Sequence, residues 1–320
     1  VGRFPRQHEE HQWPSEWYPF AYSAVPDPFT ENLDAVLKRP DTDPLVVHTH
    51  TNTEYWQRHA SLGHTDPRNG DDLDIPDNVR MYVIASAQHG GANPGEGDFT
   101  QQLSNQMSNG PTLRAVLSLM DRWATDGTPP PASRVPRRAD NTLAYPEDVL
   151  ANYPTIPGFN LPPSPSRLPK YDYGPDFDKG FITEHPPTPI AGQEYPLQLP
   201  VVDGDGNDIA GIRTPDIQAP VGTHTGWTLR KEGVAKGDFF SLTGSFVPFA
   251  RTKKEREAAN DPRLSIEERY SSHDDYVKVI TEATKKLLAD ELLIQEDADR
   301  YIEAAKKRNP LDPKVPLLPL

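Results

Sequence analysis

The stretch from Asn78 to Gly91, NVRMYVIASAQHGG, constrains the fold of this chain more than any other. Between Val79 and Ala85, apolar side chains occupy both sets of alternating positions, so both faces of an extended segment would be apolar. A strand with two apolar faces is typical of an α/β sheet that is covered on both sides. We therefore predict an α/β fold with a buried strand near residues 79–87.

A histidine follows this strand directly. His89 lies beside two glycines, and open α/β sheets carry their reactive groups in the loops beyond the strand ends. A second apolar run at residues 45–47 predicts a strand near 44–51, and Glu54 is the first carboxylate after it. The order strand, acid, strand, histidine suits a hydrolase that activates a serine on an α/β sheet. We therefore predict Glu54 as the acid and His89 as the base.

Other carboxylates compete with Glu54 for the role of the acid. Asp66 follows in the sequence GHTDP, and the run DDLD occupies residues 71–74. Long acidic loops are mostly solvated faces of a protein, which favours Glu54. Asp66 remains the alternative acid.

The histidines of the first strand allow a second interpretation, a metal-dependent hydrolase. His48 and His50 are two residues apart, so on a strand they share one face. A metal site would need a further ligand from a nearby residue, such as His59, His64 or Asp66. No carboxylate recurs at ligand spacing, and strand histidines are more often hydrogen-bonded in place, so the serine mechanism is preferred and no metal ligand is assigned.

Composition excludes several other classes. The 320 residues are 35% hydrophobic, which suffices for a substantial core, whereas 36 prolines and 21 glycines predict a large irregular fraction. The net charge of −14, with no basic block, disfavours binding to nucleic acid or to an anionic membrane. The absence of cysteine excludes disulfides and thiol catalysis, and no apolar run approaches the roughly 20 residues of a membrane-spanning helix.

Helix signals occur at three places. A short helix is expected near Thr30 to Leu37 in the aromatic and proline-rich first forty residues. A longer amphipathic helix is expected to begin near Pro111 and to end at Gly127. The last ninety residues should be helical, starting with a capping box formed by Ser265 and Glu268.

The remaining sequence suggests a division of the chain near residue 130. Residues 129–200 contain proline clusters without a sustained period and are expected to form an extended arm anchored by tyrosines. Residues 195–217 read as two short strands joined in a β-hairpin at Asp205 to Asn207. We therefore expect a catalytic core over residues 1–130, followed over 131–320 by the arm, the hairpin and terminal helices.

Several long motifs, in order along the chain, resemble the bacterial and fungal proteins known as alpha/beta hydrolase domain proteins, a branch of the serine-hydrolase superfamily. The resemblance spans nearly the whole chain. It rests on QHEEHQWPSEWYPFAY (7–22), HTNTEYWQRHASLGHTD (50–66), YVIASAQHG (82–90), DRWATDGTPPPASRVPR (121–137), VDGDGNDIAGIRTPDI (202–217), TGWTLR (225–230) and GSFVPFARTKKEREAANDPRLSIEERY (244–270).

The resemblance implies a triad in which His89 is the base and Glu54 its acid. Such hydrolases carry the nucleophilic serine in a G-x-S-x-G turn between an earlier strand and helix. No G-x-S-x-G occurs in this sequence, so the chain is expected to be the carboxyl-terminal part of an α/β-hydrolase whose serine lies upstream. The expected reaction of the complete protein is hydrolysis of a small-molecule carboxylic ester without a cofactor, and this chain alone should have little activity.

Overall fold

A parallel pair of strands lies at the centre of the molecule. The computed structural model describes residues 17–90, 99–233 and 235–320. Strand β3 (Val46–Thr51) pairs in parallel with β4 (Val79–Ile84), from Val46 opposite Val79 to Thr51 opposite Ile84. Both predicted strands are therefore present, and because they are parallel neighbours their carboxyl ends meet at the same edge.

The apolar pattern of β4 is explained by two cores. Met81 and Val83 pack on one face in a cluster with Trp56 and Trp227. Tyr82 points to the other face, where it joins a cluster that extends through the helices of the carboxyl-terminal region. Burial on both faces is what the alternating apolar residues predicted.

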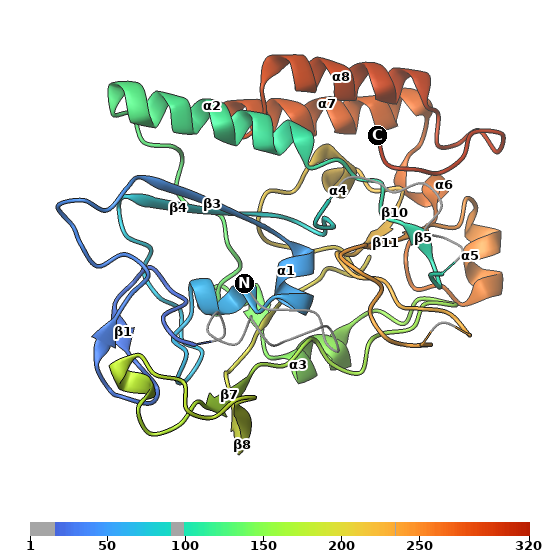
Figure 1. The fold of residues 1–320 in the computed structure, drawn as a ribbon. Helices are drawn as coiled ribbons and strands as arrows, with labels where there is room; N and C mark the ends of the chain where they lie inside the picture. Colours follow the sequence, from blue (N-terminus) through green and yellow to red (C-terminus); the bar gives the residue numbers. More distant parts are fainter. Residues whose placement is uncertain (1–16, 91–98, 234) are drawn as a thin grey trace.

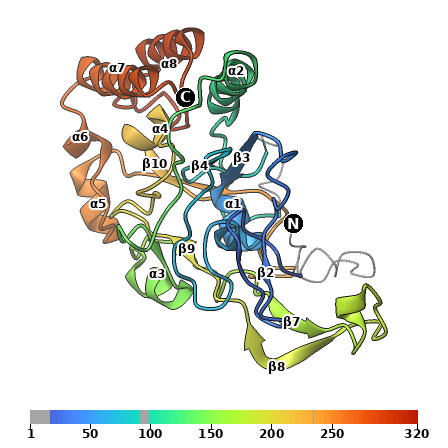
Figure 2. The same cartoon turned by 90° about the vertical axis from the view of Figure 1, so that its left-hand side faces the viewer.

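Helices cover the pair on both sides (Figures 1 and 2). On one side lie α2 (Gly110–Asp126), α7 (His273–Ala289) and α8 (Gln295–Lys307). On the other side lie α1 (Asn52–Gln57) and α3 (Pro146–Asn152). The long helix after the histidine loop and the terminal helices are thus confirmed, as is the capping box, in which Glu268 accepts the Ser265 N–H at 3.0 Å.

The remaining elements are short. The other strands are β1 (Val25–Pro26), β2 (Leu33–Asp34), β5 (Leu103–Ser104), β6 (Leu143–Ala144), β7 (Pro169–Asp172), β8 (Thr188–Glu194), β9 (Leu199–Pro200), β10 (Gly222–His224) and β11 (Ser245–Pro248). The other α-helices are α4 (Pro215–Gln218), α5 (Lys253–Ala259) and α6 (Ile266–Arg269). Within the described residues the largest sheet is the antiparallel β10–β11–β5, and the sheets β1–β2, β3–β4, β6–β9 and β7–β8 have two strands each. The expected α/β character is present, but the sheets are small.

The prediction of a helix near residues 30–37 is wrong. Two residues of the segment, Leu33 and Asp34, instead form β2, which pairs antiparallel with β1. The side chain of Asp27 accepts the backbone N–H groups of Phe29 and Thr30 at 2.7 and 2.9 Å, which closes a turn between the two strands. An aspartate that caps a turn in this way competes with helix formation, and the propensity of the following residues did not reveal it.

The expected arm and hairpin differ from the structure in detail. Residues 129–200 are not uniformly extended, because they include α3 and four short strands. The turn before Asp208 is present, with the Asp203 N–H donating to the Asn207 carbonyl at 2.8 Å, but a single bridge between Val202 and Asp208 joins its two arms. Strand β9 pairs with β6 instead. The division of the chain near residue 130 stays a prediction.

Gly226 packs where the segments after β3 and β4 meet. A Cβ atom at this position would lie 2.2 Å from the Thr53 nitrogen and 2.7 Å from the Ala87 oxygen. Both atoms belong to the backbone and cannot move cheaply, so Gly226→Ala is expected to lower the free energy of unfolding by about 2 to 3 kcal/mol. Urea denaturation measures this, with Gly204→Ala as the control because nothing lies within 4 Å of a Cβ there. Equal stabilities of the two variants would contradict the close packing.

Candidate active site

Glu54 lies in the first turn of α1, immediately after β3. Thr51 ends β3 and is the amino-terminal cap of the helix. One carboxylate oxygen of Glu54, Oε2, accepts both the backbone N–H and the hydroxyl of Thr51, each at 2.6 Å. These two bonds orient the carboxylate and leave its other oxygen, Oε1, for a different partner.

His89 is that partner. It follows β4, and its Nδ1 is hydrogen-bonded to Oε1 of Glu54. Because a carboxylate only accepts, Nδ1 carries the proton, and in the neutral ring Nε2 keeps a free lone pair. The structure thus brings together the two residues that the sequence singled out, and does so because their strands are parallel neighbours.

The two side chains differ in exposure. The side chain of Glu54 is 12% exposed and that of His89 56% exposed, so the carboxylate is shielded while the imidazole reaches solvent. Burial by itself raises the pKa of Glu54, but the hydrogen bonds from His89 and Thr51 outweigh it and the net pKa is lowered. The hydrogen bond to Glu54 raises the pKa of His89. An acid that stays ionised and accepts from Nδ1 makes Nε2 a stronger proton acceptor, which suits general-base catalysis.

These shifts predict how the pair contributes to stability. A lowered pKa of Glu54 stabilises the fold above its ordinary value of 4.5, and this is lost as pH falls through the folded pKa. A raised pKa of His89 stabilises the fold below its ordinary value of 6.5, and this is lost as pH rises through the folded pKa. The free energy of unfolding of the unchanged protein should therefore exceed that of the Glu54→Gln variant by the largest amount between pH 4.5 and pH 6.5. Urea denaturation at a series of pH values measures this difference. A difference that is independent of pH would contradict the pairing.

A pocket of about 610 Å³ opens beside the pair. It is lined by four consecutive residues of β3, His48 to Thr51, together with Glu54 and His89. Successive side chains of a strand point to opposite faces, so a hollow that touches all four runs along the edge of the strand. Within residues 17–90, 99–233 and 235–320, β3 pairs with β4 alone, which leaves this edge without a neighbouring strand.

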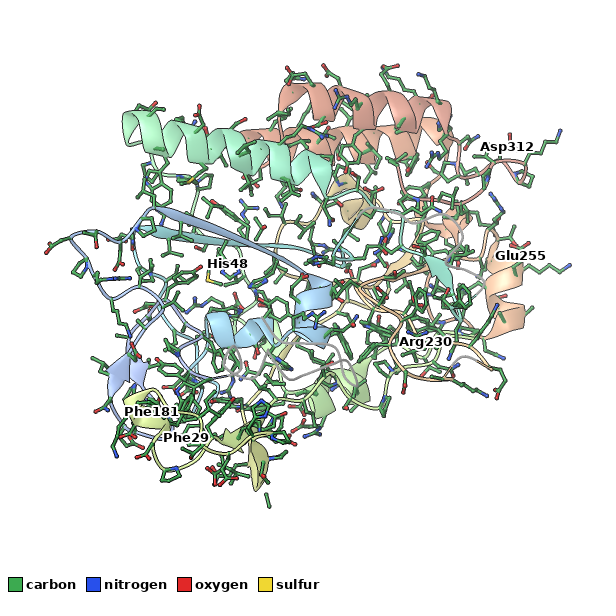
Figure 3. The ribbon with its side chains drawn as sticks, in the orientation of Figure 1. Phe29, His48, Phe181, Arg230, Glu255 and Asp312 are labelled. Carbon is green, nitrogen blue, oxygen red and sulfur yellow. The ribbon has the colours of Figure 1, made fainter. Side chains whose placement is uncertain are left out.

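The two strand histidines share one face, as predicted. Their rings are 4.1 Å apart between centroids, and the Tyr22 hydroxyl is hydrogen-bonded to Nδ1 of His48 at 3.1 Å. Figure 3 labels His48 on the side of β3 that faces away from α2. Burial lowers the pKa of both rings, that of His50 to about 3, so both are neutral near pH 7. They line the pocket as neutral hydrogen-bonding groups.

The structure does not assemble the alternative metal site. His64 is hydrogen-bonded to the Tyr55 hydroxyl at 2.7 Å, and His59 is buried near the backbone of residues 166–167. In the part of the chain that is described, no group of three or more histidine, aspartate or glutamate side chains is arranged to hold a metal ion. The metal-dependent interpretation therefore gains no support from the geometry.

Asp66 is engaged elsewhere. Its carboxylate forms a two-point ion pair with Arg68, with distances of 3.0 Å to Nε and 2.6 Å to Nη2. In the acidic run at 71–74, Asp72 accepts the backbone N–H groups of Arg138 and Ala139. Of the competing carboxylates it is thus Glu54 that contacts His89.

Asn109 supports the histidine loop, and sequence reasoning missed it. It is the residue directly before α2, and its Nδ2 donates to the carbonyl oxygens of Gln88 at 2.8 Å and His89 at 3.3 Å. The available signal was an asparagine before Gly-Pro at a helix start, which marks a cap but gives no hint of the partner. Asn109 therefore connects the backbone of His89 to the start of α2.

A family model matches most of the chain. The chain belongs to the alpha/beta hydrolase domain family, whose model matches residues 7–303. Searches of curated proteins and of solved structures found no match. Family membership and the mixture of helices with a parallel strand pair indicate a hydrolase.

Among the residues that the structure describes, no helix has both the length and the apolar character needed to cross a bilayer. This agrees with the hydropathy of the sequence.

Proposed function

We propose that this chain provides the acid and the base of a serine-type hydrolase that acts on carboxylic esters. The observation that carries the proposal is the hydrogen bond between Oε1 of Glu54 and Nδ1 of His89, made at the ends of adjacent parallel strands and beside a pocket. Glu54 holds the imidazole in one tautomer, and the Nε2 lone pair of His89 is the group that takes a proton.

The reaction proceeds in two steps. Nε2 of His89 takes the proton of a serine hydroxyl as the serine oxygen bonds to the ester carbonyl carbon, and the carbonyl becomes an oxyanion. When the oxyanion collapses, the bond to the alcohol oxygen breaks and His89 returns the proton to the leaving alcohol. Water then attacks the acyl-enzyme by the same route, which releases the acid and frees the serine.

The proposal places the serine in a segment of the protein that precedes Val1. No G-x-S-x-G turn occurs in the 320 residues. The unpaired edge of β3 supports this placement, because within the described residues β3 pairs with β4 alone, and the loop after a further parallel strand at that edge would be directed toward His89. In this arrangement the present chain is the carboxyl-terminal part of the enzyme.

The lining of the pocket favours an ester with an apolar portion. Besides the polar groups of the pair, its walls carry the apolar side chains of Phe20, Val36, Ile84, Leu113 and Leu242. Polar groups, among them His48 and His50, lie along β3 between these walls, and a hollow that combines apolar walls with hydrogen-bonding groups is typical of a small-molecule site. The acyl or alcohol group would contact the apolar walls that lie outside β3 and remain open beside such a strand, with the carbonyl near His89.

A fluorophosphonate probe tests the proposed function. We expect the protein that includes the segment before Val1 to be labelled on one serine in that segment, and to hydrolyse a nitrophenyl ester with a burst of nitrophenol. Mass spectrometry of the labelled peptide identifies the residue. Absence of labelling and of hydrolysis would favour a non-catalytic role in binding, and activity abolished by chelation alone would favour the metal-dependent interpretation.

A further inference from the structure

We propose that Asp208 is a positioning residue, which ties the ends of β3 and β4 together and thereby sets the contact between Glu54 and His89. This inference rests on the proposed function, since it concerns the same pair. Asp208 itself lies in the segment after β9, more than a hundred residues from either strand. Nothing in its local sequence, GDGND, connects it to the histidine.

The contacts of Asp208 reach both strand ends. Its Oδ1 and Oδ2 accept hydrogen bonds from Nδ2 of Asn52 at 2.9 and 3.0 Å. Asn52 is the first residue after β3 and lies two residues before Glu54. Its Oδ2 also accepts the backbone N–H of Ser86 at 2.6 Å, and Ser86 lies two residues after β4, three before His89. In return, the backbone N–H of Asp208 donates to the Ser86 hydroxyl at 2.7 Å.

These hydrogen bonds have a fixed polarity. Oδ1 of Asn52 accepts the backbone N–H of Gly226 at 2.8 Å, so the amide cannot rotate without turning its NH₂ group toward another donor. Asp208 therefore faces two donors, Nδ2 of Asn52 and the N–H of Ser86. A carboxylate can accept from both, whereas an asparagine of the same size would oppose one of them with its own NH₂ group.

Two features of this connection are unfavourable by themselves: the burial of the Asp208 carboxylate and the backbone conformation of Ser86. Asp208 is 1% exposed, and burial raises its pKa to about 7 against the hydrogen bonds from Ser86 and Asn52. Ser86 has a φ of 57°, in the left-handed region that non-glycine residues rarely adopt. The reciprocal bonds with Asp208 stabilise this conformation, which turns the chain after β4 toward the position of His89.

The test measures the pKa of His89 by NMR in this chain, with His89→Ala identifying its signals. Asp208→Asn should shift the pKa of His89 from its raised value toward the ordinary 6.5. The double exchange Asn52→Asp with Asp208→Asn should restore it. The carboxylate introduced at position 52 would accept from Gly226 and from the amide introduced at position 208, while the oxygen of that amide accepts from Ser86. Ser86→Ala removes only the hydroxyl that accepts the Asp208 N–H, so it should shift the pKa of His89 by a smaller amount. This variant replaces Asp208→Asn in the test if Asp208→Asn does not fold.

Asp216 offers a matched control. It is also a buried carboxylate of raised pKa, about 6, but it accepts the backbone N–H of Leu320 and not a group from the residues that follow β3 or β4. Asp216→Asn should lower the melting temperature without moving the pKa of His89. A pKa of His89 that is unchanged in the folded Asp208 and Ser86 variants would overturn the proposal. If Glu54→Gln also leaves it unchanged, the proposed pair is wrong; if Glu54→Gln lowers it, only the role of Asp208 is wrong.

Discussion

In the protein that carries the proposed serine, His89→Ala is expected to lower kcat for a nitrophenyl ester by about a million-fold. The imidazole both removes the proton from the nucleophile and returns it to the leaving alcohol, so both chemical steps lose their proton carrier. Because Nδ1 is held by Glu54, Nε2 alone serves this purpose. Stopped-flow measurement of nitrophenol release gives the burst rate and the steady rate separately.

His185→Ala provides the control for this experiment. His185 is exposed in a loop between the 3-10 turn at Phe177–Lys179 and β8, outside the pocket. Its replacement should leave kcat within a factor of about two, which falls within the small effect expected of surface substitutions. Full activity in His89→Ala would remove the assignment of the base, whatever the identity of the nucleophile.

The second large effect is expected for Glu54→Gln, which should lower kcat by about 10⁴-fold. Glutamine at this position of the capping box can still accept the Thr51 N–H, so the start of α1 is preserved. What is lost is the charge that holds Nδ1–H of His89 and stabilises the imidazolium. The kinetic measurement should be accompanied by circular dichroism, which we expect to be unchanged.

Glu255 makes a matched control possible, because it occupies the same position of another capping box. Its Oε2 accepts the Thr252 N–H at 3.0 Å at the start of α5, and Figure 3 labels it on the far side of the molecule from His48. Glu255→Gln should therefore have the same small effect on the helix and none on kcat. Equal activities of the Glu54 and Glu255 variants would mean that Glu54 is only a helix cap.

The sequence allowed the central strands, the long helices and the pair itself to be predicted, each for a local reason. The alternating apolar residues of β4 and the stripe of α2 are periodic over a whole element, and His89 and Glu54 are the first suitable groups after their strands. The helix expected at 30–37 failed because the bonds of Asp27 to the next turn outweigh a weak helical propensity.

The supporting residues could not be predicted, because their partners are distant in the sequence. Asn52 and Asp208 meet across 156 positions, and Ser86 and Asp208 across 122. No periodicity links such residues, and asparagine, serine and aspartate are common in turns for local reasons. The sequence therefore indicated the two residues that meet, Glu54 and His89, but not the residues that hold them in place.

The capping box of α1 also dictates the length of the acidic side chain. Glu54 must bend back to Thr51 with one oxygen while the other extends to the ring of His89 on the adjacent strand end. Aspartate is one methylene shorter and could satisfy only one of these partners without a shift of the backbone. Among the ionisable residues, glutamate is thus the one that suits this position, and a homologue with aspartate here would need its acid on a differently shaped turn.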